Sequence, residues 1–113
     1  MSGEHVDEVL FSDLEQRDAM VMETGRSVYT FTITDKANRR GVLIGGNVAQ
    51  PRDAVFSGSL QADKAMWEHG VRVGARATFF LVVPQDLSGF SQVITSPLVR
   101  IRIVRGADGT AAY

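Results

Sequence analysis

The chain has 113 residues, of which 44% are hydrophobic and 22% charged, with a formal net charge of −1. This is the size and composition of one ordinary globular domain with a single modest core. The absence of cysteine excludes disulfides, thiolate metal sites and a cysteine nucleophile. No apolar run approaches the roughly 18 residues of a membrane span, and acids stand where a secretory signal carries bases, so we predict a cytoplasmic protein with no membrane partner.

The charges are unevenly distributed along the chain. Residues 1–23 hold seven acids and one base, whereas residues 24–113 hold eleven bases and six acids. We therefore predict a partly ordered acidic N-terminal segment over residues 1–18, one domain over 19–105 and a flexible tail over 106–113. Such asymmetry is typical of an interaction tail or an anion-binding body, although it also arises by chance in small proteins.

The first elements are a helical turn and a hairpin. The sequence SDLE, Ser12 to Glu15, has the spacing of a capping box and predicts a short helix start. From residue 19 apolar and polar residues alternate with a period of two, which predicts strands over 19–24 and 27–34 around a short turn. Tyr29, Phe31 and Ile33 share one face of the second strand.

Further strands follow over 41–48 and, after a turn at Gln50-Pro51, over 53–60. The Gly45-Gly46 pair and Gly58 predict sharp bends in the sheet. The segment ADKAMWEHG, residues 62–70, predicts one short internal helix that stops at Gly70. The last strands are predicted over 71–83 and 93–104.

These elements predict a mainly β fold. About six short strands with frequent turn signals favour a compact antiparallel barrel, with an N-terminal helical turn and one short internal helix.

Catalytic and metal-binding patterns are not found in the sequence. His5 lies in the acidic segment, and His69 lies beside the predicted helix stop, where a histidine interacts favourably with the helix dipole. No metal-ligand spacing, phosphate-binding loop or nucleophile motif occurs. We therefore predict no catalytic residues, no metal and no cofactor.

An arginine cluster is the strongest ligand-binding candidate. If residues 71–83 and 98–104 are antiparallel neighbours, their odd-numbered apolar residues face the core, Val99 and Ile101 among them. Arg76, Arg100 and Arg102 then share the outer face. Like charges across a strand pair repel each other, so an anion would stabilise them. The acidic segment, a nucleic acid or nucleotide, and solvent with salt all remain possible counter-charges.

Trp67 is the candidate pocket residue. A lone tryptophan on a short helix is typical of a plug at one end of a barrel. The functional alternative is an aromatic wall of a ligand pocket at the barrel mouth.

The segment VRVGARATFFLVVP, residues 71–84, together with the chain length and strand count, resembles PilZ domains, small bacterial barrels that bind a cyclic dinucleotide. The resemblance implies a barrel fold. The ligand-contacting motifs of that family are not matched, because Arg39-Arg40 lacks the Arg-x-x-x-Arg spacing and DAVFSGS, residues 53–59, does not fit the second motif. The ligand is therefore not carried over.

The sequence predicts a small non-catalytic protein-interaction or self-assembly module. Its binding partner would be another protein or a second copy of the chain. An exposed apolar patch involving Met20, Met22 or Phe90 would be its signature. The alternative is an anion-binding module that recognises nucleic acid or a nucleotide through Arg76, Arg100 and Arg102.

Overall fold

The computed structural model describes residues 4–82 and 91–106. Those residues form eleven strands and two single turns of 3-10 helix. The strands are β1 (Glu4–Val6), β2 (Glu8–Leu10), β3 (Ala19–Thr24), β4 (Val28–Asp35), β5 (Arg40–Gly45), β6 (Val48–Leu60), β7 (Met66–Trp67), β8 (Gly70–Arg72), β9 (Arg76–Leu81), β10 (Ser91–Ile94) and β11 (Leu98–Val104); the turns are η1 (Phe11–Asp13) and η2 (Lys36–Asn38).

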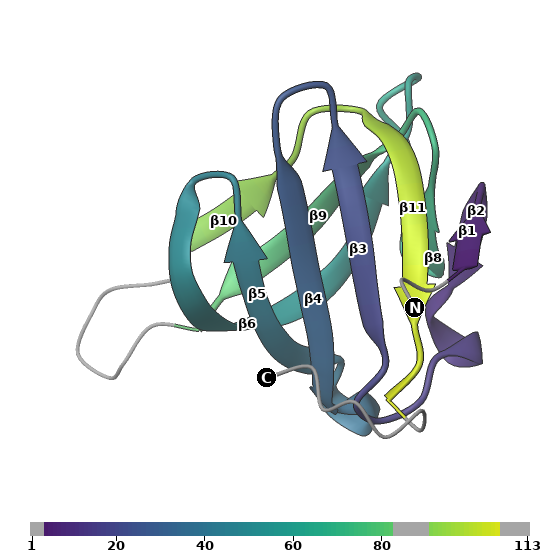
Figure 1. Ribbon diagram of the computed structural model, residues 1–113. Coiled ribbons are helices and arrows are strands. Elements are labelled where there is room, and N and C mark those ends of the chain that lie inside the picture. Colours follow the sequence, from purple (N-terminus) through teal and green to yellow (C-terminus); the bar gives the residue numbers. More distant parts are fainter. Residues whose placement is uncertain (1–3, 83–90, 107–113) are drawn as a thin grey trace.

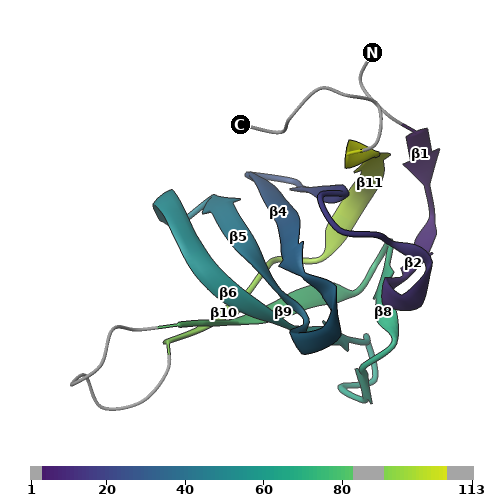
Figure 2. The same ribbon diagram turned by 90° about the horizontal axis from the view of Figure 1, so that it is seen from below.

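Nine strands form one curled antiparallel sheet in the order β1-β11-β3-β4-β5-β6-β9-β10, with β7 paired to β6, while β2 and β8 form a separate pair. In Figure 1, β11, β3, β4 and β5 lie in front of β9 and β10. The 13-residue strand β6 bends and pairs with β5 along one part and with β9 along the other, so it joins the two layers. Figure 2, seen from below, shows the sheet curling around an interior.

The prediction of a mainly β antiparallel fold is confirmed, but the closed six-stranded barrel is wrong. In the described part of the chain, β1 and β10 end the sheet and do not pair with each other. The predicted pairing of residues 71–83 with 98–104 is also wrong, because β11 pairs with β3 on one edge and β1 on the other. Both backbone edges of β11 are thus occupied, and β9 lies between β6 and β10.

Four phenylalanines form the centre of the core. Phe56 stacks on Phe11 at a centroid distance of 5.4 Å and contacts Phe79 at 5.6 Å, while Phe31 and Phe79 are 5.0 Å apart. All four are at most 5% exposed. The prediction that Tyr29, Phe31 and Ile33 share one face of β4 is confirmed, and all three are buried in the core.

Glycines bend the sheet where the sequence predicts. Gly45 and Gly58 have φ angles of 127° and 131°, and the pairing register shifts beside each of them. The predicted turn at Gln50-Pro51 is wrong, because β6 runs through both residues. Pro51 lies close to the register shift in the β5–β6 pairing, and irregular pairing is one of the few places where a sheet tolerates proline.

The predicted helix over residues 62–70 is wrong. A turn follows Leu60, in which the Gln61 amide donates to the Ala65 carbonyl and the Asp63 carboxylate accepts from the Ala65 amide. Lys64 takes a left-handed φ of 69°, which an α-helix does not accommodate. This segment does not form a helix, because the Asp63 side chain bonds the backbone of its own turn and β7 pairs with β6.

The predicted N-terminal helix start is reduced to the single turn η1. The capping box does not form: Leu10 occupies the cap position, and it makes no side-chain cap bond. The Ser12 carbonyl instead accepts a hydrogen bond from the Lys36 side chain. Val9, Phe11 and Leu14 bury their side chains in the core, so packing determines the shape of this segment.

Gly70 is required for the close approach of β2 and β8. A Cβ atom there would lie 1.8 Å from the Val9 carbonyl oxygen. We expect Gly70→Ala to lower the free energy of unfolding by about 3 kcal/mol, because rigid backbone must move to accept the methyl group. Denaturant unfolding measures the loss. The matched control is Gly25→Ala, where no atom lies within 4 Å of the new Cβ; an equal effect in both variants would refute the close-approach argument.

Candidate interaction surface

The outward-facing side chains of β11, β3, β4 and β5 form three aligned rows, which we call the outer face. They face outward because the residues between them, such as Met20, Met22 and Phe31, are fully buried in the core. The strand registers align the rows as Arg100, Glu23 and Val28; Arg102, Val21, Thr30 and Ile44; and Val104, Ala19, Thr32 and Val42. The middle of the outer face therefore consists of apolar and threonine side chains.

Strand β3 is apolar on both of its faces. Met20 and Met22 point into the core, and Ala19 and Val21 lie on the outer face. A strand with apolar residues at successive positions is typical of a sheet covered on both sides, whereas a sheet with one solvated face alternates apolar and polar residues. The composition of β3 agrees with its burial, because Ala19 and Val21 are only 2% and 8% exposed within the single chain.

Large apolar side chains are exposed on or beside the outer face. Val28 is 49% exposed and Ile44 is 37% exposed. Val99, 59% exposed, was predicted to point into the core, and that prediction is wrong. An irregularity between Leu98 and Arg100 turns both Val99 and Arg100 outward, and Leu98 takes the buried position instead.

Charged residues lie at the rim of the outer face and form ion pairs. Arg100 lies 4.0 Å from the Glu23 carboxylate, and Arg40 lies 3.5 Å from that of Asp53. An apolar centre with a polar rim is the usual anatomy of a protein–protein interface. The signature residues predicted from sequence are different: Met20 and Met22 are 0% exposed and so cannot form a patch, and Phe90 lies outside the described residues.

The three predicted arginines are not brought together. Arg100 and Arg102 lie on β11 and belong to the outer face, whereas Arg76 begins β9 in register with Leu60 of β6. Arg76 donates a 3.4 Å hydrogen bond to the carbonyl of Thr95. Their role in ligand binding stays a prediction, but one cluster of all three does not exist.

Trp67 lies on β7, not on a helix, and its side chain is partly exposed. The Arg72 guanidinium lies 4.1 Å from the centre of the indole ring, and His69 contacts the ring edge-on at 6.2 Å. Arg72 is also 3.4 Å from the Glu8 carboxylate. A cation–π contact thus covers one face of Trp67 and links β7, β8 and β2; whether the ring also lines a ligand pocket stays a prediction.

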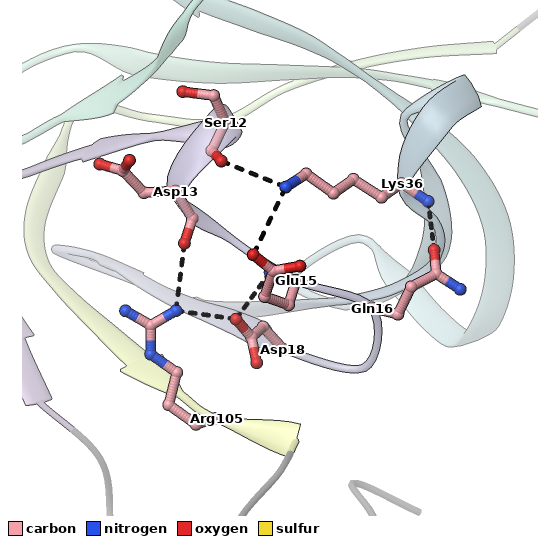
Figure 3. A network of polar contacts seen from close by, with 7 residues as sticks. All are labelled: Ser12, Asp13, Glu15, Gln16, Asp18, Lys36 and Arg105. Atoms are coloured by element: carbon pink, nitrogen blue, oxygen red, sulfur yellow. Dashed lines mark hydrogen bonds and ion pairs between the residues drawn. The ribbon is translucent and has the colours of Figure 1, made fainter.

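The acidic segment supplies counter-charges to several bases of the domain. Figure 3 shows two ion pairs near η1, Lys36 with Glu15 and Arg105 with Asp18. Lys36 also donates a hydrogen bond to the Ser12 carbonyl. Asp18 also accepts hydrogen bonds from the amides of Glu15 and Gly106. The acidic segment therefore supplies the counter-charge for Lys36, Arg72 and Arg105, whereas Arg100 pairs with Glu23 of the domain.

Two groups in the described part of the chain, Asp18 and Arg39, have shifted pKa values, and both are held in structural contacts. Burial by itself raises the pKa of Asp18, but hydrogen bonds from Glu15 and Gly106 and the charge of Arg105 together hold it below its usual value. Burial lowers the pKa of Arg39, partly offset by the nearby Glu68 charge. The Arg39 guanidinium lies over the rings of Phe11 and Phe56 and donates to two backbone carbonyls.

Among the residues that the structure describes, no group of three or more histidine or carboxylate side chains is placed to hold a metal ion. In the same residues, no helix is long and apolar enough to cross a membrane. The chain matches no protein-family model, no curated protein and no solved structure.

Proposed function

We propose that the protein is a non-catalytic interaction module that self-associates through the outer face. The observation that carries the proposal is the exposure of Val28 and Ile44 on the outer face, at 49% and 37%, together with Val99 at 59% on β11. Exposed apolar side chains on a sheet gain free energy when a second layer removes them from water.

A second copy of the chain is the occupant that the charges support. The rim carries ion pairs of both signs, Arg100 with Glu23 and Arg40 with Asp53, so two identical faces meet without a large like-charge conflict. A two-fold symmetric pair uses the same patch on both subunits, and this is the commonest arrangement of homo-oligomers. Two twisted sheets pack face to face by interdigitating the side chains of their facing rows.

Sedimentation of the full chain over a range of concentrations tests the proposal. We expect the wild-type protein to shift from monomer to dimer as its concentration rises. Ile44→Asp places a carboxylate in the middle row, and we expect it to weaken association by more than about tenfold, equivalent to about 1.4 kcal/mol, because a charge without a partner would be buried.

The matched control is Met66→Asp, which introduces the same charge at a residue that is 50% exposed on β7, away from the outer face. It should leave association unchanged. A wild-type protein that stays monomeric throughout, or a Met66→Asp variant that dissociates as Ile44→Asp does, would overturn the proposal. Circular dichroism of both variants confirms that they keep the fold.

A further inference from the structure

A hollow of about 420 Å³ lies at the end of the sheet where β6 ends and β9 begins. It is lined by Leu60, Gln61, Ala62, Lys64, Gly74, Arg76 and Pro97. These residues come from three connections: the turn after β6, the link between β8 and β9, and the bend between β10 and β11 (Figure 1). The volume is in the range of small-molecule sites.

Hydrogen bonds join two of the three connections, the link between β8 and β9 and the bend between β10 and β11. The Gly74 amide donates to the Leu98 carbonyl at 2.8 Å, and the Leu98 amide donates to the Ala75 carbonyl at 2.9 Å. The Thr95 hydroxyl accepts from the Ala77 amide, and the Thr95 carbonyl accepts from Arg76. These two walls of the hollow are therefore joined to each other, and the pairing of Leu60 with Arg76 places the end of β6 beside them.

Two cations line the hollow without a counter-charge. Lys36, Arg40, Arg72, Arg100 and Arg105 each have a carboxylate oxygen within 4.0 Å. Within residues 4–82 and 91–106, Lys64 and Arg76 have none, and the same holds for Arg17, Arg26 and Arg52, which do not line this hollow. The nearby Asp63 carboxylate is bound to the Ala65 amide in its own turn. The positive charge of the hollow is thus left for an external anion.

Lys64 is also held in an unfavourable backbone conformation. Its φ of 69° lies in the left-handed region, which glycine adopts without strain and lysine does not. The turn between β6 and β7 imposes this conformation, since the Lys64 amide donates to the Gln61 carbonyl and the Gln61 amide donates to the Ala65 carbonyl. The turn therefore fixes the backbone of Lys64 at the edge of the hollow.

We propose that this hollow binds the phosphate group of a small organic phosphate. An arginine presents a planar fork that matches phosphate oxygens, and a lysine adds a compact point charge. The Gln61 side-chain amide donates to Ser59, so the two cations supply the recognition of the anion. Leu60, Ala62 and Pro97 provide apolar wall for the organic part of the ligand.

The lining favours a small molecule over a nucleic-acid strand. Proteins that bind single strands stack successive bases on aromatic side chains, and none of the residues that line this hollow is aromatic. The site is also independent of the outer face, since it is formed by different strand ends.

Amide NMR spectra of the full chain, recorded at fixed ionic strength, test the site with pyrophosphate and adenosine monophosphate as probes. We expect saturable shifts of the Lys64, Gly74 and Arg76 amides with both probes. Arg76→Gln and Lys64→Gln should each weaken binding at least tenfold. Arg52 is on the same strand as Leu60 but lines a different depression, so Arg52→Gln is the matched control. The Arg52→Gln variant should bind both probes as tightly as the wild type does.

Lys64→Gly separates binding from folding. It relieves the backbone strain, so the melting temperature should be equal to or higher than that of the wild type while binding is lost. No saturable shift with either probe, binding of pyrophosphate but not of adenosine monophosphate, or an equal loss in Arg52→Gln would overturn the proposal. Sedimentation of Arg76→Gln should match the wild type, which distinguishes this site from the self-association proposed above.

Discussion

Replacing Phe56 with alanine is expected to lower the free energy of unfolding by about 4 kcal/mol. Phe56 is 1% exposed and contacts Phe11, Phe31 and Phe79, so it is the shared member of the aromatic cluster. Its removal leaves a cavity that surrounding strands cannot close, because β6 is hydrogen-bonded on both sides at this point. Chemical denaturation with a constant m-value measures the change.

Phe56→Leu is the matched control, because leucine keeps most of the apolar volume but loses the stacked ring. Its cost should be less than half that of Phe56→Ala. The Arg39 guanidinium lies 5.1 Å from the Phe56 ring centre, so both variants also remove one cation–π contact. Equal costs would mean that the ring contacts, and not the buried volume, dominate the stability of the core.

Asp18→Asn is expected to lower the free energy of unfolding by about 3 kcal/mol at neutral pH. The Asp18 side chain is 3% exposed and lies 2.8 Å from Arg105 (Figure 3). Its two oxygens accept from the amides of Glu15 and Gly106, and an asparagine amide group would face one of those donors. Urea unfolding at pH 7 measures the loss. Glu15→Gln, at an exposed ion pair of 3.8 Å, is the control and should cost about 0.5 kcal/mol or less.

The wild type and Asp18→Asn also test how the contribution of Asp18 to stability depends on pH. The pKa of Asp18 is lower in the folded protein than its usual value, so its ionised form stabilises the fold. This contribution is fully present above the unfolded-state pKa of about 3.9 and is lost as the pH falls through the folded-state pKa. The stability difference between wild type and Asp18→Asn should therefore shrink below about pH 4. A difference that is constant from pH 7 to pH 3 would contradict the assignment.

Strand β4 and the glycine bends were predictable from sequence because local chemistry determines them. Alternating aromatic and threonine residues fit a half-buried strand, as Phe31 and Thr30 do. Gly45 and Gly58 adopt φ angles that other residues avoid. These features need no knowledge of which strands are neighbours.

Strand pairing was not predictable, because it depends on contacts between distant residues. The comparison of odd and even positions assumed that β9 and β11 are neighbours, whereas β1 occupies the available edge of β11. Val99 was placed in the core by strict alternation, and one irregularity in the β11–β3 register reversed it. The helix over 62–70 failed for a related reason, because Met66 and Trp67 pair with the end of β6.

The outer face was partly visible in the sequence. The strand over 19–24 was predicted from a period of two, but its first four residues, Ala19 to Met22, are apolar at every position, which is not the alternation of a strand with one solvated face. Val28 and Ile44 carried no such signal, because their position on one surface depends on the registers of β3, β4 and β5. The hollow at Lys64 and Arg76 depends on three connections that only the folded chain brings together.

The position of β11 has a consequence for how the protein is made. This last strand lies between β1 and β3, and Arg105 and Gly106, just beyond it, bind Asp18, 87 and 88 residues earlier in the chain. A ribosome releases the N-terminal residues first, so Met20 and Met22 lack their β11 neighbours until residue 103 has emerged. The sheet is therefore completed only after this region has been synthesised. Until β11 pairs with it, one edge of the apolar strand β3 is exposed and can aggregate.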